Sequence, residues 1–350
     1  MTPLAALLAQ RIAATGPISL ADYMADCLMH PKYGYYATRD PFGVSGDFTT
    51  APEISQMFGE LIGLCLAQAW IDQGMPSPII LAEIGPGRGT LMADALRATK
   101  GVAGFHAALT VHFIETSATL RKRQAEAVPN ATWHDSIETL PQGPFYLIAN
   151  EFFDALPIRQ FTRDAAGWRE HMVGVEGDTL LMGLSAPAPI AMLEDRLADT
   201  KAGDIVEYCP ALPSIVGEIS ARIEAHGGAA LIIDYGDWRS LGNTLQALQD
   251  HAPANPLANP GQADLTAHVD FEAIAKAATS FTRVTTQGVF LERLGITARA
   301  QALAKGLTDA ALEAHIQAHW RLTHPDAMGA LFKVIGLFPK NGTPPAGLEI

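Results

Sequence analysis

The chain contains little cysteine and comparatively little positive charge. Its three cysteines among 350 residues, Cys27, Cys65 and Cys209, form no C-x-x-C pair. This excludes a zinc ribbon and a disulfide framework and fits a reducing compartment. The 24 basic residues are outnumbered by 37 acidic ones, so the net charge is −13. Because phosphate backbones are polyanionic, this charge argues against a nucleic-acid partner and is compatible with a basic protein or peptide.

Long apolar runs and targeting signals are also missing. Polar residues interrupt the longest apolar candidate, residues 54–70, so we expect no membrane span. The N-terminal stretch MTPLAALLAQRIAATG is too short and too weakly basic for a secretory signal or a transit peptide. We therefore expect a cytoplasmic protein. No metal is expected, because His315 and His319 lack the glutamate of a metalloprotease motif between them.

Strand-like and helix-like segments alternate along most of the chain. The early strand-like runs are short and nearly all apolar, which is typical of strands covered on both faces. This alternation predicts an α/β fold with a doubly wound, Rossmann-like, mostly parallel sheet of seven strands and helices on both faces. The seven expected strands are residues 78–85, 109–116, 131–135, 145–150, 229–236, 281–287 and 330–338.

Two parts of the chain fall outside this alternation. Residues 1–50 predict an N-terminal helical segment, with a capping box at Ser19, followed by a loop rich in Gly, Pro and Tyr. The main domain is expected over 51–350, with insertions at about 158–228 and 291–322. The early part of the first insertion alternates like an antiparallel ribbon, and the second is helical in pattern.

The most informative motif is ILAEIGPGRGTLMADAL, in which a strand runs into Gly85, Pro86, Gly87 and Gly89 and then into a helix. In an open α/β sheet this position is the crevice where ligands bind. The dinucleotide fingerprint fails because position 90 is Thr, and no G-K-[ST] follows for a phosphate-binding P-loop. Glu83, two residues before the first glycine, suits a ligand that carries an amine and a sulfonium. S-adenosylmethionine (SAM) is such a ligand.

Two further acids follow the next two strands. Glu115 is placed to accept the ribose hydroxyls of SAM, and Asp135 is placed near the adenine edge. Acids at three successive strand ends form a stronger signal than a glycine motif alone. A different nucleotide and a purely structural glycine turn remain the alternatives.

Four segments of the chain together closely resemble the MidA-like methyltransferases: SGDFTTAPEISQMFGE, EIGPGRGTLM, ANEFFDALP and DLTAHVDF. The likeness covers nearly the whole chain. It implies a class I SAM-dependent methyltransferase fold. The family includes the mitochondrial complex I assembly-factor arginine methyltransferase. For that member, the resemblance implies symmetric dimethylation of an arginine in a complex I subunit, and hence a protein substrate.

The stretch FYLIANEFFDALP ends the fourth expected strand with Asn150, Glu151 and Asp154. We expect Glu151 and Asp154 to share one face of a helical turn and, with Asn150, to bind the substrate. Carboxylates paired with a guanidinium fix its orientation and leave one nitrogen facing the methyl donor. The alternative is turn chemistry, with Asp154 capping a helix and the two phenylalanines packing in the core.

The stretch GVSGDFTT offers a second candidate element. A nucleophile elbow would need Gly at position 47, where the chain has Asp47, so a hydrolase is excluded. We expect this loop to fold over SAM as a lid that brings Asp47 to the cofactor. Three readings follow: a protein-arginine methyltransferase for a complex I subunit or its bacterial counterpart, a small-molecule methyltransferase, and an assembly chaperone that binds SAM without turnover.

Overall fold

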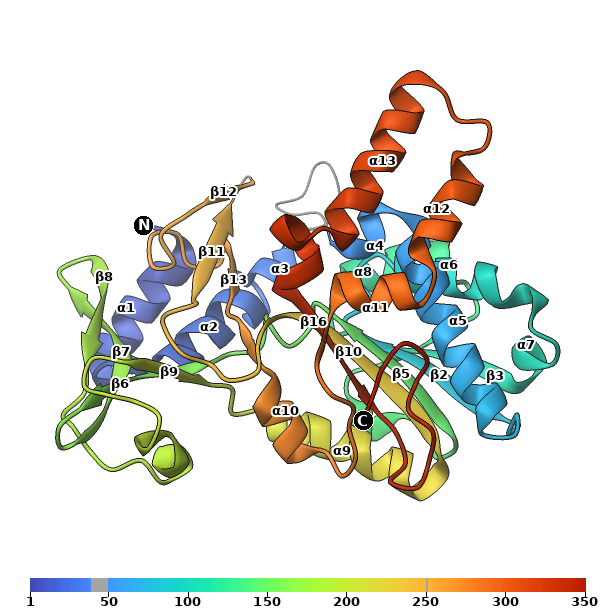
Figure 1. Ribbon diagram of the computed structural model, residues 1–350. Helices are drawn as coiled ribbons and strands as arrows, with labels where there is room; N and C mark the ends of the chain where they lie inside the picture. Colours follow the sequence, from blue (N-terminus) through green and yellow to red (C-terminus); the bar gives the residue numbers. More distant parts are fainter. Residues whose placement is uncertain (39–49, 250) are drawn as a thin grey trace.

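A mostly parallel sheet forms the centre of the computed structural model, which describes residues 1–38, 50–249 and 251–350 (Figure 1). Its strand order is β15-β16-β10-β5-β2-β3-β4, and the short strand β14 pairs with β10. The run from β10 to β4 is parallel, whereas β16 and β15 are antiparallel to their neighbours. The strands are β2 Ile79–Ile84, β3 Leu109–Ile114, β4 Thr132–His134, β5 Phe145–Asn150, β10 Gly228–Asp237, β14 Val269–Asp270, β15 Thr285–Thr286 and β16 Phe332–Leu337.

This arrangement confirms the predicted α/β fold with a mostly parallel sheet: the main order has seven strands, and β14 adds a short eighth. Every residue of β2 and β5 is buried, as their continuous apolar sequences predict. One expected strand, 281–287, is much shorter than its composition indicates. Only Thr285–Thr286 pairs with β16, and Phe281 forms an isolated bridge to Leu337. This segment lies at the sheet edge, where a single neighbour provides the pairing.

Helices cover both faces of the sheet. Side chains that alternate along each central strand point to opposite faces and enter two separate hydrophobic clusters. Helices α5, α6, α11, α12 and α13 pack on one face, and α9 and α10 pack on the other. The helices are α3 Tyr35–Thr38, α4 Ala51–Ile54, α5 Gln56–Asp72, α6 Thr90–Ala98, α7 Phe105–Ala108, α8 Ala118–Ala127, α9 Leu212–His226, α10 Phe271–Ala277, α11 Gln287–Arg293, α12 Ile296–Ala304 and α13 Asp309–Thr323.

The N-terminal helices pack on the first insertion. Helices α1 and α2 share a hydrophobic cluster with the antiparallel strands and with the segment around Leu265, and β1 pairs with β7. Ser19 begins α2 and accepts a hydrogen bond from the Asp22 amide, so the predicted cap is confirmed. The elements are α1 Pro3–Thr15, β1 Ile18–Ser19, α2 Leu20–Met29, β6 Arg159–Asp164, β7 Gly167–Glu176, β8 Thr179–Leu184, β9 Ile205–Tyr208, β11 Gln246–Gln249, β12 Ala252–Pro253 and β13 Asp264–Thr266.

This packing bears on the expected domain organisation. The antiparallel part of the first insertion ends near Tyr208, because the following helix α9 covers the central sheet and belongs to the main fold. The division at residue 50 stays a prediction. The shared core joins residues 1–38 and the antiparallel strands into one lobe beside the central sheet (Figure 1).

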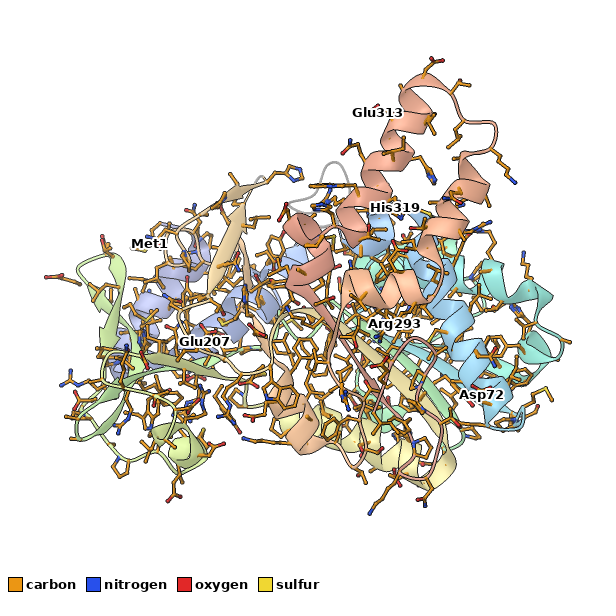
Figure 2. All side chains as sticks on the ribbon, in the orientation of Figure 1. Met1, Asp72, Glu207, Arg293, Glu313 and His319 are labelled. Atoms are coloured by element: carbon orange, nitrogen blue, oxygen red, sulfur yellow. The ribbon has the colours of Figure 1, made fainter. Side chains whose placement is uncertain are left out.

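The second insertion forms a helical hairpin that projects from the sheet. Helices α12 and α13 extend beyond the other elements (Figure 1). Glu313 and His319, both on α13, are labelled in Figure 2. Two histidines of α13 form hydrogen bonds with α12: His315 with the Ala300 carbonyl and His319 with the Thr297 hydroxyl. Within residues 1–38, 50–249 and 251–350, no helix has both the length and the apolar character needed to cross a membrane.

A buried carboxylate ties three helices of one layer together. Glu60 of α5, which is 3% exposed, accepts hydrogen bonds from Arg97 of α6 and Arg299 of α12. Burial alone would raise the pKa of Glu60. The hydrogen bonds and charges of the two arginines outweigh burial, so the pKa lies below its usual value of 4.5.

We expect Glu60→Gln to lower the free energy of unfolding by about 1–3 kcal/mol, because it removes a charged acceptor whose arginine partners are partly exposed. The folded-state pKa is depressed, so this stability is present above the unfolded pKa and is lost as pH falls through the folded pKa. Denaturant titrations should therefore show the wild-type advantage at pH 7 and its decline below pH of about 4.5. Asp26→Asn, which breaks a surface pair with Arg11, is the matched control and should cost about 0–1 kcal/mol. An equal loss in both variants would contradict this account.

Candidate functional site

The parallel strands deliver a row of polar residues to one edge of the sheet. Glu83 lies within β2, and Gly85 follows that strand, with its amide bonded to the Ile114 carbonyl of β3. Gly85 has φ 63°, a left-handed conformation, and a Cβ there would lie 3.1 Å from the Phe152 ring. Gly89 begins α6 at φ 81° and donates its amide to the Pro86 carbonyl. The glycines thus allow a tight turn in close contact with the Phe152 loop.

Two pockets meet at this turn. A cleft of about 370 Å³ runs past Glu115 and Asp135, and its size falls in the range of small-molecule sites. A smaller pocket of about 40 Å³ contains Glu83 and Asn150. Both pockets share Gly85, Gly87 and Glu151 in their walls. A ligand that occupies both must therefore pass Glu151.

The smaller pocket contains buried acceptors that need donors. Among the described residues, neither Oε2 of Glu83 nor Oδ1 of Asn150 has a hydrogen-bond partner, although both atoms are buried. Burial raises the pKa of Glu83 to about 8. Since a buried acceptor without a donor is costly, these atoms fit a cationic, donor-bearing group. The ammonium of SAM is such a group.

The larger cleft contains the second and third predicted acids. Glu115 accepts hydrogen bonds from the Ser117 amide at 2.7 Å and from Gln124 at 3.1 Å, and its remaining lone pairs can accept from hydroxyls. Burial raises the pKa of Glu115, and these donors oppose the shift. Asp135 lies at the rim with its side chain 81% exposed and paired with Arg121. It lines the cleft, but mainly faces solvent.

The loop after β5 is held by two successive residues of β10. The Glu151 amide donates to the Ile233 carbonyl at 2.9 Å. The next three amides, from Phe152 to Asp154, all donate to Oδ2 of Asp234 at 3.0–3.2 Å. Glu151 itself has φ 50°, an uncommon conformation for a residue with a side chain, which costs about 1–3 kcal/mol. The hydrogen bonds that follow it hold the chain in this conformation.

This geometry differs from the expected helical turn and agrees only in part with the alternative of turn chemistry. No helix begins between residues 151 and 158, so Glu151 and Asp154 lie on a turn, and Asp154 caps no helix. The expectation of a shared helical face is wrong, because Asp234 binds the amides that a helical turn would have directed along its own axis. Phe153 is buried in the core as predicted, while Phe152 contacts the glycine turn and lines the cleft.

The acids of this loop share a low-dielectric environment. Burial raises the pKa of Glu151 to about 7, with Asp154 adding to the shift; the Ala51 amide, Asn150 and Arg321 oppose it. Burial raises the pKa of Asp154 to about 6, and the nearby Tyr235 side chain opposes that shift. Oδ1 of Asp154 lacks a hydrogen-bond partner among the described residues. Glu151, which lines both pockets, can therefore accept from a group with N–H donors, whereas Asp154 lies behind it and lines neither of the two pockets.

Sequence reasoning missed several supporting residues. Gln124 is fully buried and joins the Gly87 carbonyl, Glu115 and the Trp133 indole, although nothing in its helix pattern marks it. The Ala51 amide donates to Oε1 of Glu151 at 3.0 Å, a backbone contact that no motif encodes. The predicted cofactor contact of Asp47 lies outside the described residues.

Comparison with known proteins identifies the family. A model of the family described as S-adenosyl-L-methionine-dependent methyltransferase matches residues 61–290. A zebrafish (Danio rerio) relative, "Protein arginine methyltransferase NDUFAF7, mitochondrial", is 37% identical over 93% of this chain and 84% of its own length. The human (Homo sapiens) protein of the same name is 35% identical over 97% and 84%. This chain belongs to the MidA-like family of SAM-dependent methyltransferases. The predicted resemblance is confirmed.

Two similar solved structures agree with the fold and the cofactor. A COG1565 superfamily member from Burkholderia thailandensis, bound to S-adenosyl-homocysteine, matches 98% of this chain and 93% of its own at 28% identity, with a TM-score of 0.82. A native structure from the same organism matches at 29% identity, with a TM-score of 0.83 and the same coverage. The class I methyltransferase fold and the SAM cofactor are thereby confirmed for this MidA-like protein.

The names of the arginine methyltransferase relatives correct the expected cellular location of the protein. The cytoplasmic expectation is wrong, because the curated relatives carry the word "mitochondrial" in their names. That expectation came only from the lack of a recognisable targeting signal. A missing signal does not define a compartment.

The raised pKa of Glu83 predicts a proton linkage to cofactor binding. At pH 6.5, a carboxyl with a pKa of about 8 is mostly protonated, while the α-amine of S-adenosylhomocysteine is cationic. Binding of that amine should favour the carboxylate and release up to about one proton per ligand. Calorimetry in two buffers of different ionisation enthalpy measures this release, which should largely vanish in Glu83→Gln. Equal release in both proteins would place the amine elsewhere.

Removal of the Glu115 carboxylate should directly weaken the binding of SAM. Glu115→Ala is expected to cost about 1.5–3 kcal/mol of SAM binding, the range for hydrogen bonds to a charged group. Calorimetric titration should thus show a dissociation constant roughly 10 to 150 times larger. Because Glu115 also accepts from Ser117, a thermal melt must first show that the variant folds. Unchanged affinity in a folded variant would remove Glu115 from the site.

Proposed function

We propose that this MidA-like enzyme is a protein-arginine N-methyltransferase. Its acceptor is an arginine of a protein substrate, a respiratory complex I subunit or its bacterial counterpart, whose assembly the methylation supports. The names of the curated relatives support the arginine acceptor. The observation that carries the proposal is the half-buried carboxyl group of Glu151, which lines both pockets, with the buried Asp154 three residues further along the same loop.

The acceptor site matches a guanidinium in charge and in hydrogen bonding. A guanidinium has five N–H donors and no acceptor. Oε1 of Glu151 already accepts from the Ala51 amide and from Asn150, and no donor among the described residues binds its other oxygen, which would accept from the ligand. Asp154 adds a buried acceptor oxygen three residues further along the loop. Together they provide acceptors to a planar cation and exclude an anionic substrate.

The proposed mechanism is mainly one of orientation. SAM, when bound, supplies a methyl group that its sulfonium already activates, so no metal is needed for the transfer. Glu83 and Asn150 would bind the ammonium end, and Glu115 the ribose. Glu151 and Asp154 would hold the guanidinium and localise its charge on the nitrogens they bind, which leaves a third nitrogen free for attack. An oriented nucleophile can contribute several kcal/mol to the rate. The pKa of about 7 also allows Glu151 to take up the proton that nitrogen loses.

Glu151→Gln tests this role. Gln keeps the size and one acceptor but removes the charge, so methyl transfer should fall at least tenfold, about 1.4 kcal/mol or more, with SAM affinity nearly intact. The wild-type kcat/KM should rise with pH through about 7 as Glu151 ionises, and the variant should lose that rise. The assay measures methyl incorporation into the intact protein substrate, because a short peptide lacks the remote contacts that position the arginine.

The test of Glu151→Gln includes a control variant and distinguishes the two alternative functions. Glu126→Gln removes an exposed carboxylate on α8 and should leave the rate unchanged. A small-molecule methyltransferase with a neutral acceptor would be far less sensitive to Glu151→Gln, and a chaperone without turnover would incorporate no methyl groups. Wild-type transfer by Glu151→Gln would refute the guanidinium site.

A further inference from the structure

Strand β10 contains, three residues before its end, a carboxylate that the proposed chemistry does not use. Asp234 is fully buried, and its Oδ2 accepts from the amides of Phe152, Phe153 and Asp154. Its Oδ1 accepts from the Tyr235 amide at 2.9 Å. A carboxylate that receives four backbone N–H groups is well suited to fix a loop, because charge-assisted hydrogen bonds are short and strong.

The loop that Asp234 binds is the loop that presents the acceptor acids. With the Glu151 amide on the Ile233 carbonyl, four successive amides of this loop are bound by two successive residues of β10. The far end is fixed as well, because the Ala267 amide donates to the Asp154 carbonyl at 3.0 Å. Glu151 keeps its left-handed φ only while the residues after it are held in place.

We propose that Asp234 is the positioning residue of the acceptor site, which acts through Glu151 by holding the backbone of residues 152–154. This inference rests on the proposed role of Glu151 in binding the substrate guanidinium. Among the described residues Asp234 accepts four hydrogen bonds, all from backbone amides, and its side chain is fully buried, so its proposed role is to hold the loop and not to touch the substrate. Its contribution is the direction in which the Glu151 carboxylate points.

The conservative test is Asp234→Asn. The Asn oxygen can still accept from the loop amides but carries no charge, and its NH2 group would oppose the Tyr235 amide, which is also a donor. We expect kcat for the protein substrate to fall at least tenfold, with affinity for S-adenosylhomocysteine within about twofold of wild type. Of the proposed cofactor acids, Glu83 lies on β2 and Glu115 directly follows β3, so their contacts should persist. Asp237→Asn, at the exposed end of the same strand, is the matched control and should retain the wild-type rate.

A double-mutant cycle separates positioning from general damage. If Asp234 acts through Glu151, the double variant Asp234→Asn/Glu151→Gln should be no slower than Glu151→Gln alone, within about twofold. Multiplied losses would show that Asp234 acts independently of Glu151 and would overturn the inference. Wild-type transfer by Asp234→Asn, with Glu151→Gln slow, would overturn it and leave the proposed function intact. Wild-type transfer by Glu151→Gln would instead refute the proposed function, and this inference with it.

A measurement on the wild-type protein covers the case in which Asp234→Asn fails to fold. Amides bound to a buried carboxylate should exchange with solvent deuterium slowly. Exchange at residues 152–154 should therefore be at least a hundredfold slower than at the exposed turn around Gly177, which joins β7 to β8. Exchange as fast as at that turn would show that Asp234 does not hold the loop.

Discussion

Several carboxylates are buried at one edge of a parallel sheet, and the structure around the site depends on how each is stabilised. Parallel strands end together, so Glu83, Glu151, Asp154 and Asp234 converge where both sheet faces are already covered by helices. Burial of a charge without partners is strongly unfavourable. The protein stabilises Asp234 with backbone amides, and Glu151 with the Ala51 amide and Asn150. Glu83 and Asp154 each keep a buried oxygen without a partner among the described residues. The oxygen of Glu83 lies in the smaller pocket, where the proposed ammonium would supply the donor.

Much of the fold was predictable from the sequence because its signals are local. The apolar runs of β2 and β5 have the length and continuity of strands covered on both faces, and Ser19 occupies a helix start whose chemistry is encoded within three residues. The resemblance to the MidA-like family then predicted the class I methyltransferase fold. The edge strand at 281–287 was overestimated, because β-favouring residues do not by themselves provide a second neighbour for hydrogen bonding.

The acids of the candidate site could be predicted from the sequence, but the residues that hold them in place by hydrogen bonds could not. Glu83, Glu115 and Glu151 follow from acids placed at strand ends, which is a pattern in the sequence. The hold of Asp234 on the loop from 80 residues away is a tertiary contact, and the turn residues alone gave no sign of it. Gln124 was missed for the same reason, since its three partners come from three different segments. Backbone donors such as the Ala51 amide leave no trace in side-chain motifs.

The shared core of α1, α2 and the antiparallel strands also constrains the order in which the chain can fold during synthesis. Leu4, Leu8 and Ile12 leave the ribosome long before Val173, Leu180 and Leu265, which belong to the cluster that buries them. At about 5–20 residues per second, the last of these partners follows on the order of 10–50 s later. Helix α2 and strands β7 and β8 are made earlier in that interval, so the apolar face of the first helix is covered only in part until β13 follows. The N-terminal segment is thus among the last parts to reach its native packing, and the nascent chain must be kept from aggregating until β13 has been made.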